Sequence, residues 1–253
     1  MKPMIGQHLL PGEKHFRWRA GEITRLEAFT DAVFAFAVTL LVVSLEVPKT
    51  FSELIGAMKG FVAFAICFAI LVQVWYEHYV FSRRYGLQTL YTVFLNSVLI
   101  FVVLFFVYPL KFLFNIVVGG FSGGFLVTHP LEETIQLSQV PFLMVIYSLG
   151  FSSVAIVFVL LYRYAYRHRK ELDLNEYESL CTRHALYNQL AMSALGLIVA
   201  LTAVLLPLRL SGASGYLYVL IGVYYWIAGS AFGRQETLVL EKMQAQSDAA
   251  AGS

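Results

Sequence analysis

The sequence predicts an all-α, polytopic membrane protein with six transmembrane helices and with both termini in the cytoplasm. The first observation is composition: 58% of the residues are hydrophobic and only 13% are charged, where a soluble domain averages roughly 25% charged residues. The second is that six apolar segments can each span most of a hydrocarbon core of roughly 30 Å. The third is the uneven distribution of Lys and Arg between the loops.

The six segments differ in their polar content. The first carries ionisable groups, Arg25 and Asp31, at one end and hydroxyls inside, which a bilayer tolerates only where protein or water surrounds them. The fourth and fifth have no charge, and the last is short and rich in Tyr, as expected of a helix anchored in the interface. The expected spans are residues 28–47, 55–78, 90–110, 141–162, 188–208 and 215–233.

Fourteen of the eighteen Lys and Arg residues fall on one side of these spans, together with the N-terminus. An excess of Lys and Arg marks cytoplasmic loops. We therefore expect residues 1–24 to be a cytoplasmic N-terminal segment, 25–233 to be the membrane domain and 234–253 to be a cytoplasmic tail, with 243–253 disordered. The connection 111–140, which contains a glycine-rich stretch, is expected to be a flexible outer loop.

Several function classes lack support. The net charge of +2 gives no reason to expect nucleic acid as a partner, and the two cysteines are expected to stay reduced. No hydrolase motif of the G-x-S-x-G or H-E-x-x-H kind is present, so we expect neither an enzyme nor a cofactor. Haem ligation by histidines is a remote alternative, because only His78 lies beside a span near other polar groups.

A helical wheel divides the first span into two faces. One face is an apolar stripe that contains a single hydroxyl, while Thr30 and Asp31 point about 120–140° away from Phe36. Such a stripe is usually packing or lipid contact, but a ring of Phe36 side chains from several subunits could also form a hydrophobic constriction that closes by dewetting. The stripe consists of Phe29, Ala32, Phe36, Thr39, Leu40 and Val43.

Five polar or aromatic side chains from the first three spans are expected at similar depth. A buried carboxylate can be satisfied there by an indole N–H, an imidazole and an amide. The first interpretation is a structural hydrogen-bond network, and the alternative is a proton-conducting or proton-coupled transporter that uses Asp31 and His78 as a relay. The group comprises Arg25, Asp31, Trp75, His78 and Asn96.

The stretch Arg25 to Asp31, RLEAFTD, resembles the R-x-x-x-F-S-D signature of the transmembrane protein 175 family, which comprises potassium channels of endolysosomes and of prokaryotes. Trp75 and His78 are similar to a Trp/His pair late in the second helix of that family. Asn96 and Pro109 are similar to its third helix. The resemblance covers roughly residues 22–110.

The resemblance implies a prokaryotic homotetramer in the plasma or inner membrane, with the first helix lining a central pore. It places the narrowest point at Phe36 and cation selectivity, with a potassium ion nearby, at Thr39; Leu40 and Val43 would complete the wall. We expect modest selectivity for K⁺ over Na⁺. Phe36 differs from the Ile or Leu of the family and changes the space at the constriction. The network that positions the helix would be Arg25, Phe29, Thr30, Asp31, Trp75, His78 and Asn96.

Overall fold

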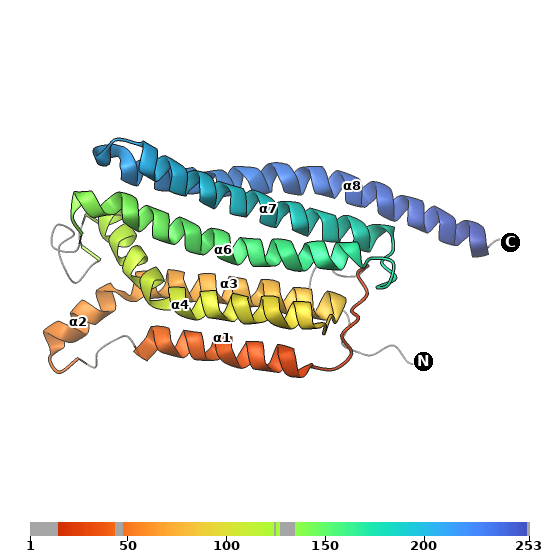
Figure 1. The fold of residues 1–253 in the computed structure, drawn as a ribbon, viewed down its shortest axis with the longest axis horizontal. Helices are drawn as coiled ribbons and strands as arrows, with labels where there is room; N and C mark the ends of the chain where they lie inside the picture. The colour runs from red at the N-terminus through yellow and green to blue at the C-terminus, as the bar shows by residue number, and fades with distance from the viewer. Residues whose placement is uncertain (1–14, 44–47, 124, 127–134, 252–253) are drawn as a thin grey trace.

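A computed structural model describes residues 15–43, 48–123, 125–126 and 135–251, and these residues form helices and short connections without any strand. The long helices lie lengthwise beside one another (Figure 1). In chain order they are α1 Arg25–Val43, α2 Phe51–Lys59, α3 Phe61–Tyr85, α4 Leu90–Phe121, the 3-10 helix η1 Leu137–Gln139, α6 Val140–Arg167, α7 Glu176–Leu205, the 3-10 helix η2 Leu208–Val219 and α8 Leu220–Ala251.

Five segments of the described chain are long and apolar enough to cross a membrane. They are Phe61–Tyr85, Leu90–Val107, Leu137–Arg167, Glu176–Leu205 and Leu208–Gln246. The helix α1 is not among them, and residues 44–47 of the expected first span lie outside the described residues. The all-α fold is thus confirmed, whereas the count of six spans stays a prediction.

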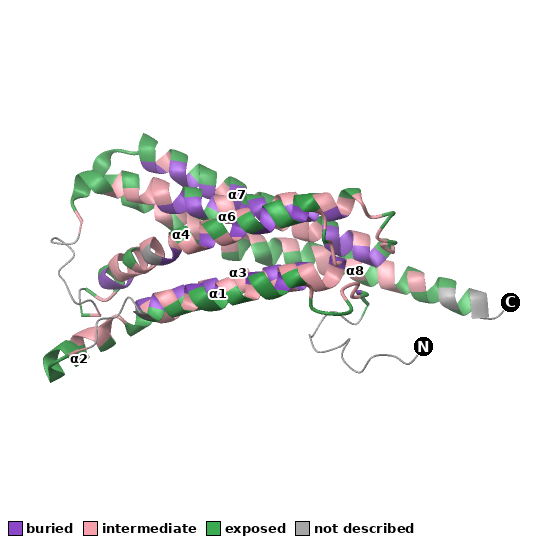
Figure 2. Cartoon of the chain, turned by 60° about the horizontal axis from the view of Figure 1, so that its bottom comes forward, coloured by how far each residue is buried: buried purple, intermediate pink, exposed green. Residues whose placement is uncertain are grey.

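The helices form layers from one edge of the bundle to the other. α1 packs against α3 and α4, α4 packs against α6, α6 packs against α7, and α8 packs on α7. The core lies between these layers, while α2 and the last turns of α8 are largely exposed (Figure 2). Its largest fully buried apolar side chains include Leu41, Leu99, Phe158 and Leu161.

Short connections with local caps hold the helix ends near the N-terminal segment. α3 ends at Gly86, whose φ of 58° is left-handed and whose missing Cβ leaves room for the backbone of Ala20. The Thr89 hydroxyl accepts a hydrogen bond from the Thr92 amide at the start of α4. At the start of α7, Asn175 and Glu178 form a capping box. These caps fix where the chain enters each long helix.

Part of the expected outer loop is helical, which corrects the prediction for residues 111–140. α4 continues through Pro109 as far as Phe121 and bends near its middle (Figure 1). A proline removes one backbone hydrogen bond and kinks a helix, but neighbouring helices can satisfy the freed carbonyls. The carbonyl that loses its partner is that of Phe105, four residues before the proline. The Tyr147 hydroxyl of α6 donates to the carbonyl of Pro109 itself, which joins α6 to α4 at this point. Residues 127–134 of the predicted loop lie outside the described residues.

Two other expected boundaries also differ. The predicted second span, 55–78, is two helices that meet at Gly60, and α3 runs on to Tyr85. The tail expected to be disordered is helical as far as Ala251, because α8 passes residue 234 without a break. An ion pair of 2.9 Å between Lys242 Nζ and Glu176 Oε2 ties this helix to the start of α7. The last turns of α8 project beyond the bundle (Figure 1).

A close contact between α6 and α7 suggests a stability test at Gly196 of α7. A Cβ at this position would lie 3.0 Å from the Ser148 carbonyl oxygen of α6 and would collide with the Ser152 hydroxyl, which donates a hydrogen bond to the Ser193 carbonyl. We expect Gly196→Ala to lower the free energy of unfolding by about 1–3 kcal/mol through overpacking.

Thermal unfolding of the purified protein measures this effect. The matched control is Gly222→Ala in α8, where the added Cβ meets nothing within 4 Å and the better helix propensity of Ala should leave the protein as stable or more so. Equal unfolding temperatures for Gly196→Ala and the wild type would contradict the close α6–α7 contact.

Candidate functional site

One face of α1 is buried, and its packing fixes the orientation of the helix about its own axis. Its buried residues recur at intervals of three and four, the spacing of a single helix face, and they pack toward α3 and α4. Even the carboxylate-bearing Glu27 is only 3% exposed on this face. The buried residues are Glu27, Thr30, Phe34, Ala37 and Leu41.

Most of the predicted stripe lies on the opposite, exposed face of α1. Phe29 and Phe36 are 58% and 55% exposed in the single chain, and Ala32 and Thr39 are exposed as well. Leu40 is half-buried and packs against the core. The side chain of Val43, the last residue of α1, lies outside the described residues.

A hydrogen bond joins the signature stretch of α1 to α3. Trp75 Nε1 donates to Asp31 Oδ1 over 2.8 Å, and the indole stacks on Tyr79 with ring centroids 5.8 Å apart. A hydrogen bond to a charged acceptor is worth about 1.5–3 kcal/mol. The pair therefore fixes the first turns of α1 against α3.

A second polar pair joins α3 to α4. His78 Nε2 and Asn96 Oδ1 lie 2.8 Å apart, so that the imidazole donates to the amide oxygen when Nε2 carries the proton. Both side chains are buried, and the ring of Phe34 from α1 lies against His78 with centroids 6.4 Å apart. The network proposed from the sequence is therefore two separate pairs, Asp31 with Trp75 and His78 with Asn96.

The remaining two polar residues of the signature stretch have other surroundings. The Thr30 hydroxyl donates to the Leu26 carbonyl of its own helix over 2.8 Å. Arg25 is exposed, and no hydrogen bond or ion pair joins it to another residue of the described chain. Neither side chain takes part in the two pairs that hold the helices together.

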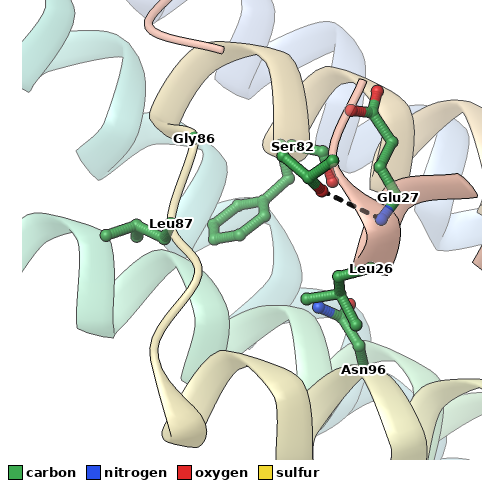
Figure 3. A pocket seen from close by; sticks show the side chains of 8 residues that line it. Leu26, Glu27, Ser82, Gly86, Leu87 and Asn96 are labelled. Carbon is green, nitrogen blue, oxygen red and sulfur yellow. Dashed lines mark hydrogen bonds between the residues drawn. The ribbon is translucent and has the colours of Figure 1, made fainter. Parts of the chain in front are cut away.

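An ion pair that the sequence reasoning missed lies next to these contacts. Glu27 Oε1 is 3.1 Å from Arg83 Nε, and the two side chains are 3% and 15% exposed. A cavity of about 10 Å³ lies beside Glu27 and is lined by Leu26, Ser82 and Asn96 among others. Figure 3 shows that the Glu27 carboxylate points away from Asn96. The ion pair places a second contact between α1 and α3 one turn from Asp31.

The N-terminal segment before α1 is held by a buried carboxylate of α7. Glu178 accepts hydrogen bonds from Arg17 Nε over 3.2 Å and from Arg19 Nη2 over 2.6 Å. The hydrogen bond with Glu178 raises the pKa of the Arg17 guanidinium above its usual value. The backbone amides of Arg19 and Ala20 both donate to the carbonyl of Arg83. The start of α7 is thereby connected to the end of α3.

The spacing along the chain explains why these contacts were missed. Glu178 and its arginine partners are separated by 161 and 159 residues, and no local pattern links such distant positions. Glu27 looks like an ordinary acidic residue in the first turn of a helix. The one available signal was the capping pattern of Asn175 followed by Glu178, which predicts a helix start but not its arginine partners.

The exposed face of α1 is mainly apolar. In the described part of the chain, no group of three or more His, Cys, Asp and Glu side chains could hold a metal ion. The exposed face of α1 instead offers two phenyl rings and one hydroxyl. Such a face can narrow a water-filled passage and contact a partly dehydrated ion.

Comparisons with known proteins agree on one family. The family profile described as "Endosomal/lysosomal potassium channel TMEM175" matches residues 25–107. A protein of Marivirga tractuosa named "Potassium channel" is 39% identical over 212 residues, which cover 81% of this chain and 86% of the relative. A potassium channel of Chamaesiphon minutus is 36% identical over 66 residues, 23% of this chain and 32% of that protein.

A solved structure is similar over most of the chain. It is the crystal structure of a variant of the potassium channel MtTMEM175 in complex with a nanobody fusion protein. The TM-score is 0.76 at 37% sequence identity, and the match covers 88% of this chain and 97% of that one.

The Trp75–Asp31 hydrogen bond leads to a prediction about stability. Trp75→Phe keeps an aromatic ring but removes the N–H donor, leaving Asp31 Oδ1 without its partner. We expect the free energy of unfolding to fall by about 1–3 kcal/mol. Thermal unfolding in detergent measures this, with Trp226→Phe as the matched control because Trp226 is 77% exposed on α8. Equal losses of stability in both variants would show that the hydrogen bond does not hold α1.

Proposed function

The chain belongs to the TMEM175 family of potassium channels, and on this basis we propose that it conducts potassium through a pore lined by the exposed face of α1. The observation that carries the proposal is the exposure of the stripe on α1. Phe29 and Phe36 are more than half exposed, while the opposite face of the helix packs against α3 and α4. α1 lies at an edge of the bundle (Figure 1), where a second copy of the chain can reach it.

The proposed assembly is a homotetramer in the plasma or inner membrane, with both termini in the cytoplasm. Four copies of α1 would face a common axis and bring four Phe36 side chains together. A ring of apolar side chains closes a narrow passage by dewetting, since water leaves it more readily than it leaves a polar one. Because phenyl rings can rotate about χ1 and χ2, they can also open the constriction without a shift of the helix.

Thr39 supports the proposed selectivity through the geometry of its hydroxyl. Its Oγ1 donates to the Ala35 carbonyl over 2.9 Å, so the hydroxyl proton is engaged within the helix. A hydroxyl oxygen keeps two lone pairs as acceptors, and these remain available to a potassium ion in the pore. Leu40 and Val43 would complete the wall further along α1, although Leu40 also packs against the core of its own chain.

The polar pairs have a positioning role in this proposal. Trp75 with Asp31 and His78 with Asn96 hold α1, α3 and α4 in register. The alternative is a proton pathway through Asp31 and His78. In the described part of the chain, no hydrogen bond joins those two side chains, so the geometry favours positioning. Flux that occurs only with protons and disappears in Asp31→Asn would support the alternative.

The hydrophobic constriction is tested by removing the phenyl ring. We expect Phe36→Ala to raise basal potassium flux several-fold in liposomes, because four smaller side chains leave a wider and more readily wetted passage. The matched control is Phe142→Ala, since Phe142 is 70% exposed on α6 and lies outside the stripe. Unchanged flux in both Phe36→Ala and Phe36→Asn would remove Phe36 from the gate.

The role of the Thr39 hydroxyl is tested by measuring ion selectivity. Thr39→Val has a similar shape but lacks the oxygen, so we expect the ratio of potassium to sodium flux to fall while total flux persists. The same liposomes with potassium or sodium gradients measure the ratio, and Thr202→Val on α7 is the matched control, because its hydroxyl also bonds within its own helix. A ratio that is unchanged in Thr39→Val would assign selectivity elsewhere.

A further inference from the structure

A second polar feature lies on the other side of α3 from the proposed pore. α3 packs against α1, α2 and α4 in the described chain but not closely against α7 or α8. The space between them is a cavity of about 380 Å³ that is also lined by Tyr162 of α6. Trp75 and Glu77 of α3 are two positions apart and thus point about 160° away from each other. One faces α1, and the other faces this cavity.

The charges around the cavity are predominantly negative. Glu77 and Glu236 contribute carboxylates from α3 and α8, whereas Arg84 is the one guanidinium among the lining residues. The Tyr162 hydroxyl donates to Glu77 Oε2 over 3.5 Å, and the Tyr177 hydroxyl donates to Glu236 Oε1 over 3.0 Å. The two carboxylates outnumber the guanidinium by one, which leaves a net negative charge on the wall of the cavity. The cavity therefore favours a cationic ligand.

Aromatic rings form much of the remaining wall. Tyrosine faces attract cations through their negative quadrupole, most strongly where water is excluded. His184 does not add a free face, because it stacks on Phe232 with centroids 4.2 Å apart and lies 3.2 Å from the Asn188 amide nitrogen. The tyrosines that line the cavity are Tyr76, Tyr162, Tyr177 and Tyr225.

We propose that this cavity binds an organic ammonium ion with an apolar body, with Glu77 and Glu236 as the charge partners and the tyrosine rings as the walls. A concave site of this size, with aromatic side chains and a few convergent polar groups in its wall, is typical of small-molecule pockets. Arg84 at the same site disfavours ligands that carry more than one positive charge. The ammonium group belongs either to a free amine or to a lipid headgroup of the ethanolamine type.

The test uses a pair of probes that differ only in charge. Phenethylamine, an ammonium ion at neutral pH, and the neutral 2-phenylethanol are titrated by calorimetry into the full-length protein in phosphatidylglycerol nanodiscs. We expect phenethylamine to bind at least about tenfold more tightly, which corresponds to about 1.4 kcal/mol. Equal affinity of the two probes would overturn the proposal. Since no ion gradient is involved, the outcome is independent of the proposed conduction.

Variants assign the binding to this cavity. Glu236→Gln keeps an acceptor for the Tyr177 hydroxyl but removes the charge, so we expect phenethylamine affinity to fall about tenfold. Glu241→Gln on the exposed side of the same helix is the matched control. Tyr225→Leu removes an aromatic wall without changing charge and should also weaken binding. Wild-type affinity in both Glu236→Gln and Tyr225→Leu would place the binding elsewhere.

A second titration, in nanodiscs of a different lipid composition, distinguishes the two sources of the ammonium group. The titration is repeated in nanodiscs that also contain phosphatidylethanolamine. Weaker apparent binding of phenethylamine would identify the headgroup as a competing occupant of the cavity. Unchanged binding would identify a free amine as the ligand. Both results support an ammonium site, and binding of phenethylamine in neither preparation would contradict it.

Discussion

The hydrogen bond from Trp75 to Asp31 and the ion pair of Glu27 with Arg83 fasten one side of α1 to α3. The two acidic residues are four positions apart and so lie on neighbouring turns of one helix face. With these contacts in place, α1 cannot rotate without breaking both, and the face that carries Phe36 must point away from its own chain. The polar contacts on one face of α1 would thus decide which side chains on its opposite face line a pore.

The same end of the bundle connects helices that are far apart in the chain. Arg83 accepts backbone hydrogen bonds from the N-terminal segment through its carbonyl and contacts Glu27 through its side chain. That segment is held in turn by Glu178 at the start of α7. Arg19 and Arg83 thus connect Glu178 of α7 to Glu27 of α1 through a continuous chain of contacts. Glu178 is fully buried with its charge matched by arginines, and such matching is needed for a buried carboxylate to be tolerated.

The sequence predicted the parts of the fold that depend on local pattern. Hydrophobic segments indicated the helices. The helical wheel placed Phe36 and Thr30 on different faces of α1, because the residues on one face recur with the helical period. It failed for residues 111–140, where the glycine-rich stretch indicated a flexible loop: α4 continues through Pro109 as far as Phe121. It also missed the partners of Glu27 and Glu178, because contacts between distant segments leave no local signal.

The most direct measurement of the central claim is thiol accessibility on the two faces of α1. Cys181 lines the cavity of about 380 Å³, so the experiment uses a Cys181→Ser background. The remaining native Cys67 is buried, and a water-soluble, membrane-impermeant methanethiosulfonate reagent then reports on introduced cysteines. Thr39→Cys and Ala37→Cys would be compared in liposomes during potassium flux, since Thr39 is exposed whereas Ala37 is fully buried. Modification that blocks flux in Thr39→Cys and has no effect in Ala37→Cys is the predicted result. Block in neither variant, or equal block in both, would contradict a pore lined by the exposed face of α1.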